Sequence, residues 1–226
     1  MAPFFNGEHG AENMNDQIHQ LSDAENNLIR EYANILNEVR VRITGFSTIV
    51  KGTSSLPSWL TAELLYLQLR LLCELVAVGC LVAHGDMGKE EVQQLGKRHE
   101  PGLILKKLEE LHPQFFPRPI SVTSGENVHH IEHAKSDFLT KEEFLRLYAE
   151  CHRHLHRGNL SQIFSQINPK KPPRIEDALH WAAQLLALLN CHHIASFIEG
   201  KNLICFLAHE QVGGDALVVA ALAAQN

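Results

Sequence analysis

The residues best suited to chemistry lie at the end of one segment, LTKEEFLRLYAECHRHLHRGN, which spans residues 139–159. His152 and His156 are four residues apart, so on a helix they stand one turn apart on the same side. Histidine changes its charge near neutral pH and can therefore accept or donate a proton during a reaction. We treat the two histidines as candidates for proton transfer.

The chain around these histidines is basic. Residues 140–174 contain seven basic and three acidic side chains, a local charge of +4 on a chain whose net charge is −6. Such a patch on an acidic protein suits a phosphate-bearing ligand better than a cation. Arg157, Lys170 and Lys171 are the candidate phosphate-binding residues. The overall charge argues against a protein that coats nucleic acid with its whole surface.

The stretch AECHRHLHRGN, on an amphipathic helix, resembles a degenerate form of the Arg-x4-6-His motif of HEPN domains, which are small helical bundles prominent in prokaryotic defence and toxin systems. Arg146 and His152 have the motif's spacing, although Leu147 stands where the family usually has a polar residue. The family's more typical ending, a histidine directly before a small residue, points to His156. The resemblance implies a metal-independent endoribonuclease whose arginine and histidine meet in a cleft, often across a homodimer.

If the protein cleaves RNA, the side chains take definite roles. His152 or His156 would deprotonate a ribose 2′-hydroxyl or protonate the leaving oxygen, and Arg146 or Arg153 would stabilise the charge that develops around phosphorus. Arg153 and His156 are neighbours on a helix. Arg146 and His152 lie about 120° apart around it, so they would act together only across an interface. These four residues are the catalytic candidates.

A second interpretation stays open. The same histidines and arginines can be solvated cations of a last helical turn, which the helix dipole stabilises. The protein would then be a non-catalytic helical interaction module, with RNA replaced by a protein partner. A cleft that contains the histidines and arginines favours the enzyme, whereas histidines dispersed on a convex surface favour the module.

We expect no cofactor and no native metal site. His152 and His156 have the spacing of two metal ligands, but the first lacks the adjacent glutamate of the metalloprotease pattern, and the arginines repel a dication. A second cluster, His129, His130 and His133, is expected in a solvated loop. The sequence contains no glycine-rich phosphate loop and no dinucleotide fingerprint, which argues against nucleotide-dependent enzymes.

The cysteines and the N-terminus indicate a cytoplasmic protein. Five cysteines lie far apart without a C-x-x-C pair, which is typical of buried thiols in a reducing compartment; they are Cys73, Cys80, Cys151, Cys191 and Cys205. The first residues, MAPFFNGEHG, lack the pattern of a secretory signal. The most apolar run, 71–83, is too short to span a bilayer, so we expect no membrane contact.

Hydrophobic periodicity predicts a mainly α protein, a helical bundle with a C-terminal β-hairpin, in a single domain. Residues 1–21 form a polar N-terminal segment, 22–196 the bundle and 197–226 the hairpin, for which a final helix is the alternative. The expected helices start at a capping box, Ser22 to Glu25, or at similar signals; they span about 22–50, 57–85, 88–98, 101–112, 140–156 and 175–194. Residues 112–135 are expected to be an exposed connection.

One charged pair stands inside the most apolar helix. Arg70 and Glu74 are one turn apart, where unpaired charges are costly, so we expect a buried structural ion pair, either with each other or with Arg40 or Arg42 of the first long helix. The alternative is that both line a cleft between helices together with His84.

Overall fold

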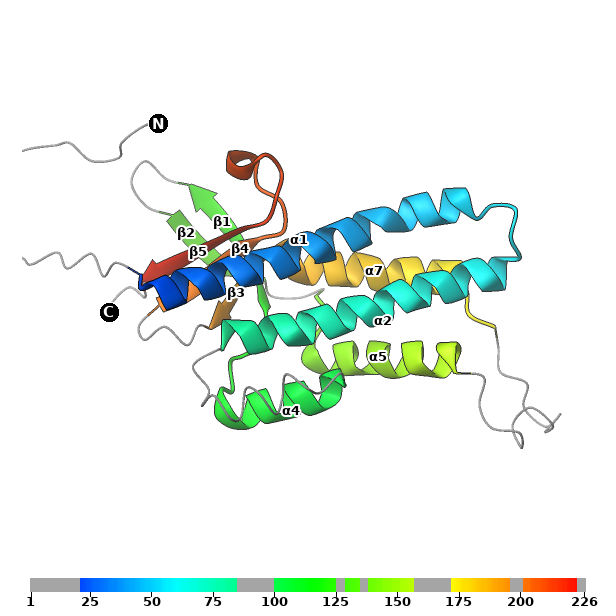
Figure 1. Cartoon of the computed structure of the whole chain (residues 1–226), viewed down its shortest axis with the longest axis horizontal. Coiled ribbons are helices and arrows are strands. Elements are labelled where there is room, and N and C mark those ends of the chain that lie inside the picture. The colour runs from blue at the N-terminus through cyan, green and yellow to red at the C-terminus, as the bar shows by residue number, and fades with distance from the viewer. Residues whose placement is uncertain are drawn as a thin grey trace, which may run out of the picture.

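The computed structural model describes residues 21–84, 100–124, 129–134, 138–156, 172–195 and 201–222. Within them five α-helices and five strands follow one another. The helices are α1 (Asp23–Gly52), α2 (Ser58–Ala83), α4 (Pro101–Leu111), α5 (Lys141–Leu155) and α7 (Ile175–Leu189). The strands are β1 (Arg118–Ser124), β2 (His129–His133), β3 (Cys191–Ala195), β4 (Lys201–Phe206) and β5 (Leu217–Leu222). The predicted mainly helical class is confirmed, and the sheet lies at one end of the helices, beside the first part of α1 (Figure 1).

Both predicted capping boxes are present. The Ser22 hydroxyl accepts a hydrogen bond from the amide of Glu25, whose carboxylate accepts one from the amide of Ser22. Thr140 and Glu143 form the same pair of bonds at the start of α5, at 3.2 and 3.0 Å. Each box satisfies amides that a helix start leaves without a partner. The second box fixes where α5 begins, so His152 falls in its last turn and His156 is its C-cap.

Helix α2 is the centre of the molecule. It packs against α1, α4, α5 and α7, and its side chains of Leu65, Tyr66, Leu69 and Leu72 are fully buried. Among the described residues it is the helix whose length and composition would allow it to cross a membrane, and 56% of its most apolar stretch is buried inside the protein. Packing by four other helices therefore covers much of its apolar surface.

The sheet is antiparallel, in the order β2-β1-β3-β4-β5. One face packs on the helices through side chains such as Ile194, Leu203 and Cys205, which are almost fully buried. The predicted C-terminal hairpin is confirmed as β4 and β5. Gly213 and Gly214 in its connection have φ of 70° and 88°, a left-handed conformation that glycine adopts without strain.

Two predicted elements are wrong. Residues 112–135 are not an irregular connection, because β1 and β2 pair within them and place Val122 opposite Ile131; the prolines that suggested a loop precede or begin β1, where a strand tolerates them. The last helix ends at Leu189 rather than near 194, and the next residues form β3, because pairing with β1 and β4 outweighs local helix propensity. The predicted helix 88–98 and nearly all of segment 1–21 lie outside the described residues.

A buried histidine joins the helices to the sheet. His192 on β3 is fully buried, with Nδ1 2.9 Å from the carbonyl oxygen of Leu189 and Nε2 2.9 Å from the hydroxyl of Tyr32 on α1. A carbonyl only accepts, so Nδ1 carries the proton and Nε2 accepts from the hydroxyl. Burial lowers the pKa of His192 to about 4 from its ordinary 6.5. His192 is therefore neutral in the folded protein at neutral pH.

We predict that this histidine destabilises the fold in acid. Below pH 6.5 His192 becomes protonated in the unfolded chain, whereas in the folded protein it stays neutral down to about pH 4. The free energy of unfolding should therefore fall by about 3 kcal/mol between pH 6.5 and pH 4, and this histidine should not change it above pH 6.5. Urea unfolding at pH 7.5 and 4.5 should show that the free energy of unfolding falls less between these pH values for His192→Gln than for the wild type. His180→Gln, an exposed change on α7, should keep the wild-type loss. Equal losses in all three proteins would contradict the prediction.

Candidate functional site

His152 and His156 lie together at the end of α5. Their ring centroids are 4.1 Å apart and the ring planes are inclined by 40°. Both side chains are exposed, while the opposite side of the helix, Phe144, Leu147 and Cys151, is fully buried. The apolar stripe fixes the rotation of α5 against α2, and the two histidines consequently face solvent as a pair.

An arginine from α2 completes this pair. Nη1 of Arg70 lies 3.5 Å from Nε2 of His156, and its guanidinium lies 5.8 Å from the ring centroid of Tyr148. Nε of Arg70 donates to Glu74 at 3.1 Å, which confirms the predicted ion pair. The hydrogen bond to Glu74 also raises the pKa of Arg70. Arg70 is therefore a permanently charged group that three neighbours hold beside the histidines.

His84, which could have lined a cleft together with Arg70 and Glu74, is buried at the end of α2. Its Nδ1 lies 2.8 Å from the carbonyl oxygen of Cys80, and its ring lies 4.9 Å from that of His112. Ten residues of helix separate it from Glu74, which corresponds to about 15 Å. His84 is accordingly part of the core rather than of the histidine pair.

Of the two arginines named from the sequence, Arg146 lies earlier on α5, whereas Arg153 stands in its last turn next to His152. Arg146 pairs with Glu143 at 3.1 Å, and its side chain is 70% exposed. Six residues separate it from His152, which corresponds to about 9 Å along the helix axis. Arg153 lies 3.9 Å from Glu150. Arg70, which comes from a distant part of the chain and was not a candidate from the sequence, approaches His156. The predicted phosphate-binding residues Arg157, Lys170 and Lys171 lie outside the described residues.

A second polar cluster, which sequence reasoning missed, joins α5 to α2. The hydroxyl of Tyr66 donates to Oε1 of Glu150 at 2.5 Å, and Nε2 of His154 lies 3.7 Å from the same oxygen. The ring of His154 packs on that of Tyr66 with centroids 4.5 Å apart. Burial, and then the bond to Glu150, raises the pKa of Tyr66, so its hydroxyl remains a donor. The spacing of four between Glu150 and His154 was the available signal.

The remaining candidate groups are the histidines of β2 and the cysteines. His129, His130 and His133 belong to β2 rather than to a loop, and the ring of His133 lies 5.7 Å from that of His193. Within the described residues, no group of three or more metal-ligating side chains is close enough to hold an ion. The five cysteines are free, and burial raises the pKa of Cys80 and Cys151 to about 12. These two therefore remain thiols rather than nucleophiles.

Comparisons with protein-family models, with curated proteins and with solved structures gave no match. The likeness to HEPN domains consequently stays a prediction from the motif. Any assignment of function rests on the chain's own residues, above all on the side chains gathered where α5 ends beside α2.

We predict that Tyr66 stabilises this junction. Tyr66→Phe removes the donor to Glu150 and should lower the free energy of unfolding by about 1.5 kcal/mol, because the lost hydrogen bond is to a carboxylate. Glu142→Gln, an exposed change on the same helix, should alter it by less than about 0.5 kcal/mol. Urea unfolding at pH 7.5 measures both. Equal stability of Tyr66→Phe and wild type would show that the bond contributes nothing.

Proposed function

We propose that the protein is a metal-independent endoribonuclease, or a degenerate relative, of a prokaryotic stress or defence system. The observation that carries the proposal is the pair His152 and His156 beside Arg70. Two imidazoles and a fixed guanidinium are the groups that phosphodiester cleavage needs when no metal takes part. Free, buried cysteines are in keeping with a cytoplasmic protein.

The proposed reaction divides the work among these side chains. One histidine takes the proton of a ribose 2′-hydroxyl as its oxygen attacks phosphorus. The other gives a proton to the 5′ oxygen as the phosphorus–oxygen bond breaks, leaving a 2′,3′-cyclic phosphate and a 5′-hydroxyl. Arg70 binds the non-bridging oxygens of the phosphate and stabilises the negative charge that they carry in the transition state. Glu74 positions Arg70 and does not touch the substrate.

We propose Arg70 as the catalytic arginine in place of Arg146 or Arg153. Arg70 approaches His156 within one chain, whereas the two arginines of α5 pair with carboxylates of their own helix. The motif spacing between Arg146 and His152 would then be incidental. The exposed basic residues of α5 can still add to the electrostatic attraction of RNA.

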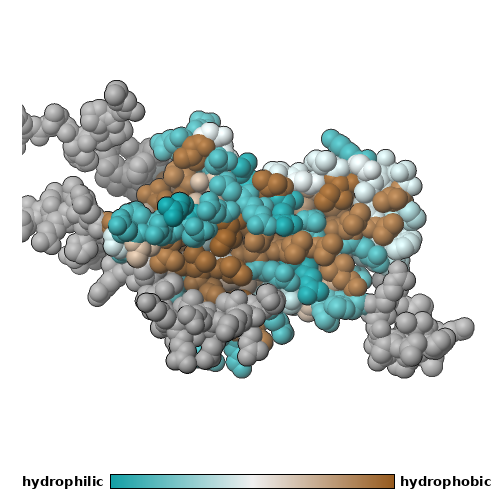
Figure 2. Space-filling view, viewed as in Figure 1, coloured by the Kyte–Doolittle hydropathy of each residue, from teal (hydrophilic) through white to brown (hydrophobic). Residues whose placement is uncertain are grey.

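We further propose that the protein acts as a homodimer through α2. Beyond its buried side, α2 carries a neutral apolar stripe at spacings of three and four, which suits helix pairing; it consists of Leu64, Leu67, Leu71, Leu75 and Val78. Leu64, Leu67 and Val78 are 37%, 41% and 39% exposed. Hydrophobic residues gather on the face that carries α1 and α2 (Figure 2). Arg70 and Glu74 flank this stripe, and Arg70 lies beside His156. A second copy bound to the stripe would therefore cover one side of the exposed histidines.

The enzyme proposal predicts loss of RNA cleavage in two variants. His152→Ala/His156→Ala and Arg70→Gln should each lower the rate by at least about 100-fold, because general acid–base catalysis and charge stabilisation contribute on that scale. The rate is measured on short labelled RNAs in the presence of EDTA, for proteins of equal melting temperature. Arg146→Ala should lower the rate by no more than a few-fold, since its charge would add to the attraction of RNA and not to the chemistry. If the folded wild type cleaves no RNA, the enzyme proposal is refuted. If Arg146→Ala loses activity and Arg70→Gln does not, the catalytic arginine is Arg146, as the motif predicts.

A mixing experiment distinguishes a site within one chain from a site shared by two. Arg70→Gln and His152→Ala/His156→Ala chains are unfolded together and refolded to form mixed dimers. A site within one chain predicts that the mixture stays inactive, since neither chain holds all the groups. A site built across the interface predicts recovery of about a quarter of wild-type activity, because half of the dimers are mixed and each has one intact site.

The alternative function, a non-catalytic interaction module, has one observation in its favour. The sheet face that points away from the helices is apolar, and it forms a hollow of about 230 Å³ lined by residues that include Val122, Ile131, Ile204 and Val219. Ile131 and Val219 are 42% and 44% exposed. An exposed apolar sheet face commonly marks a contact surface. Inactivity of the wild type on RNA would make this the leading proposal.

A further inference from the structure

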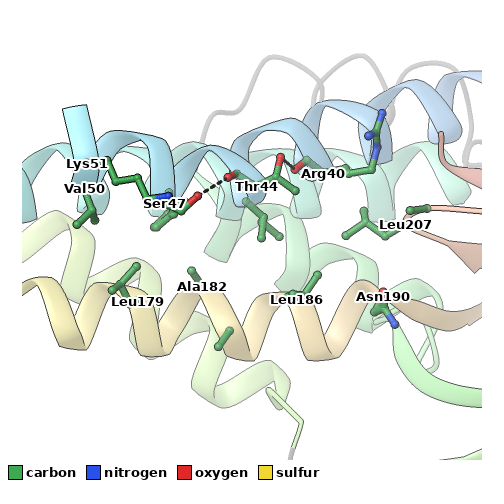
Figure 3. Close-up of a pocket in the computed structure, with 14 residues that line it drawn as sticks. Arg40, Thr44, Ser47, Val50, Lys51, Leu179, Ala182, Leu186, Asn190 and Leu207 are labelled. Carbon is green, nitrogen blue, oxygen red and sulfur yellow. Dashed lines mark hydrogen bonds between the residues drawn. The ribbon is translucent and has the colours of Figure 1, made fainter. Parts of the chain in front are cut away.

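A groove runs between α1 and α7, on helices that contribute nothing to the histidine pair. Its volume is about 710 Å³, and Figure 3 shows Val50, Leu179, Ala182, Leu186 and Leu207 around it. Both helices pack on α2, and the space between them stays open. Leu179 and Leu186 on α7 are 39% and 40% exposed there. An apolar surface of this kind, on a helix otherwise packed in the core, is suited to a partner.

Between Arg40 and Asn190 at one end and Lys51 at the other, the lining of the groove is mostly apolar and offers few hydrogen-bonding groups. The hydroxyl of Thr44 donates to the carbonyl oxygen of Arg40 at 2.9 Å, and that of Ser47 donates to the carbonyl oxygen of Thr44 (Figure 3). These polar atoms are thus engaged with their own helix. An extended peptide would leave its backbone amides and carbonyls without partners there. The occupant must therefore satisfy its own hydrogen bonds, as a helix does.

The spacing and length of the walls also fit a helix. On each wall the lining residues recur at three and four: Arg40, Ile43, Thr44, Phe46, Ser47, Val50 and Lys51 on α1, and Leu179, Ala182, Ala183, Leu186 and Asn190 on α7. Eleven residue steps on either wall correspond to about 16 Å, or three helical turns. Rows of side chains at these intervals form the ridges between which a third helix packs.

The charge of the lining selects the partner's chemistry. Arg40 and Lys51 line the groove and no carboxylate does, although the chain as a whole carries net charge −6. Arg40 is already bound to Asp215 at 2.6 Å. Lys51 is exposed at the other end, and within the described ranges no carboxylate pairs with it. A partner with acidic residues beside its apolar stripe would complement that end of the groove.

We propose that the groove between α1 and α7 binds an amphipathic helix of another protein, about three turns long, with apolar residues at i, i+3, i+4 and i+7 and an acidic flank facing Lys51. This inference stands independently of the RNA-cleavage proposal, because α5 and Arg70 take no part in it. The two surfaces would let one protein carry out chemistry at one site while it is docked through the other.

A peptide library tests the proposal. Sixteen-residue displayed peptides, with leucine or isoleucine fixed at the four apolar positions and the rest random, are selected on the full-length protein. Enriched peptides should be rich in Asp and Glu, and fluorescence anisotropy should show at least about tenfold weaker binding to Leu186→Gln and severalfold weaker binding to Lys51→Glu. Leu103→Gln, a change of an equally exposed leucine on α4, should bind as the wild type does.

Four results would overturn the proposal. Failure to enrich peptides, or enrichment of peptides that bind Leu186→Gln unchanged, would show that the groove takes no helix. If the wild type is a dimer that binds no peptide, and Leu186→Gln is a monomer, the occupant of the groove is a second copy of this chain. If the wild type binds dodecanoate and no peptide, and Leu186→Gln does not bind dodecanoate, the occupant is a hydrocarbon ligand instead.

Discussion

The burial of α2 is the constraint on which the rest of the structure depends. This helix is apolar nearly all round, and each large aliphatic side chain that it removes from water contributes about 1.5–3 kcal/mol. Helices α1, α4, α5 and α7 all pack against it, and the sheet packs on α1, α7 and α2 itself. Arg70 and Glu74 are charges on an otherwise apolar helix, so they pair with each other at the margin of the core. That margin is where α5 ends, and the candidate site follows from the same packing.

The candidate site and the proposed helix-binding groove are built on different helices of this bundle. Buried contacts of α5 with α2, reinforced by Tyr66 and Glu150, hold the two exposed histidines beside Arg70. The apolar stripe of α2 borders that site, whereas the groove between α1 and α7 does not share its residues. A dimer contact would therefore act directly on the proposed chemistry. A helix bound in the groove would instead place the protein on a partner and leave the histidines accessible.

Local signals predicted much of this fold, and non-local contacts explain what they missed. Capping boxes and helical periodicity located α1, α2 and α5 because both are properties of neighbouring residues. The strands β1 and β2 form a hairpin, but the prolines of residues 112–119 suggested a loop there; β3 was missed because it continues a helical pattern and pairs partly with β1, far along the chain. The same limit applies to the site: the spacing of His152 and His156 was visible, but the approach of Arg70 requires α2 and α5 to pack. His154 was overlooked although it follows Glu150 by one turn.

The most direct test of the central claim is whether the two histidines and Arg70 bind one phosphodiester as a unit. A 2′-deoxy dinucleotide, which lacks the attacking hydroxyl, is titrated into protein with ¹⁵N-labelled histidine rings, and the signals are assigned with single His→Asn variants. The account predicts that the rings of His152 and His156 respond along one binding curve in the wild type and that neither responds in Arg70→Gln. A response of only one ring, or of both rings without Arg70, would contradict it.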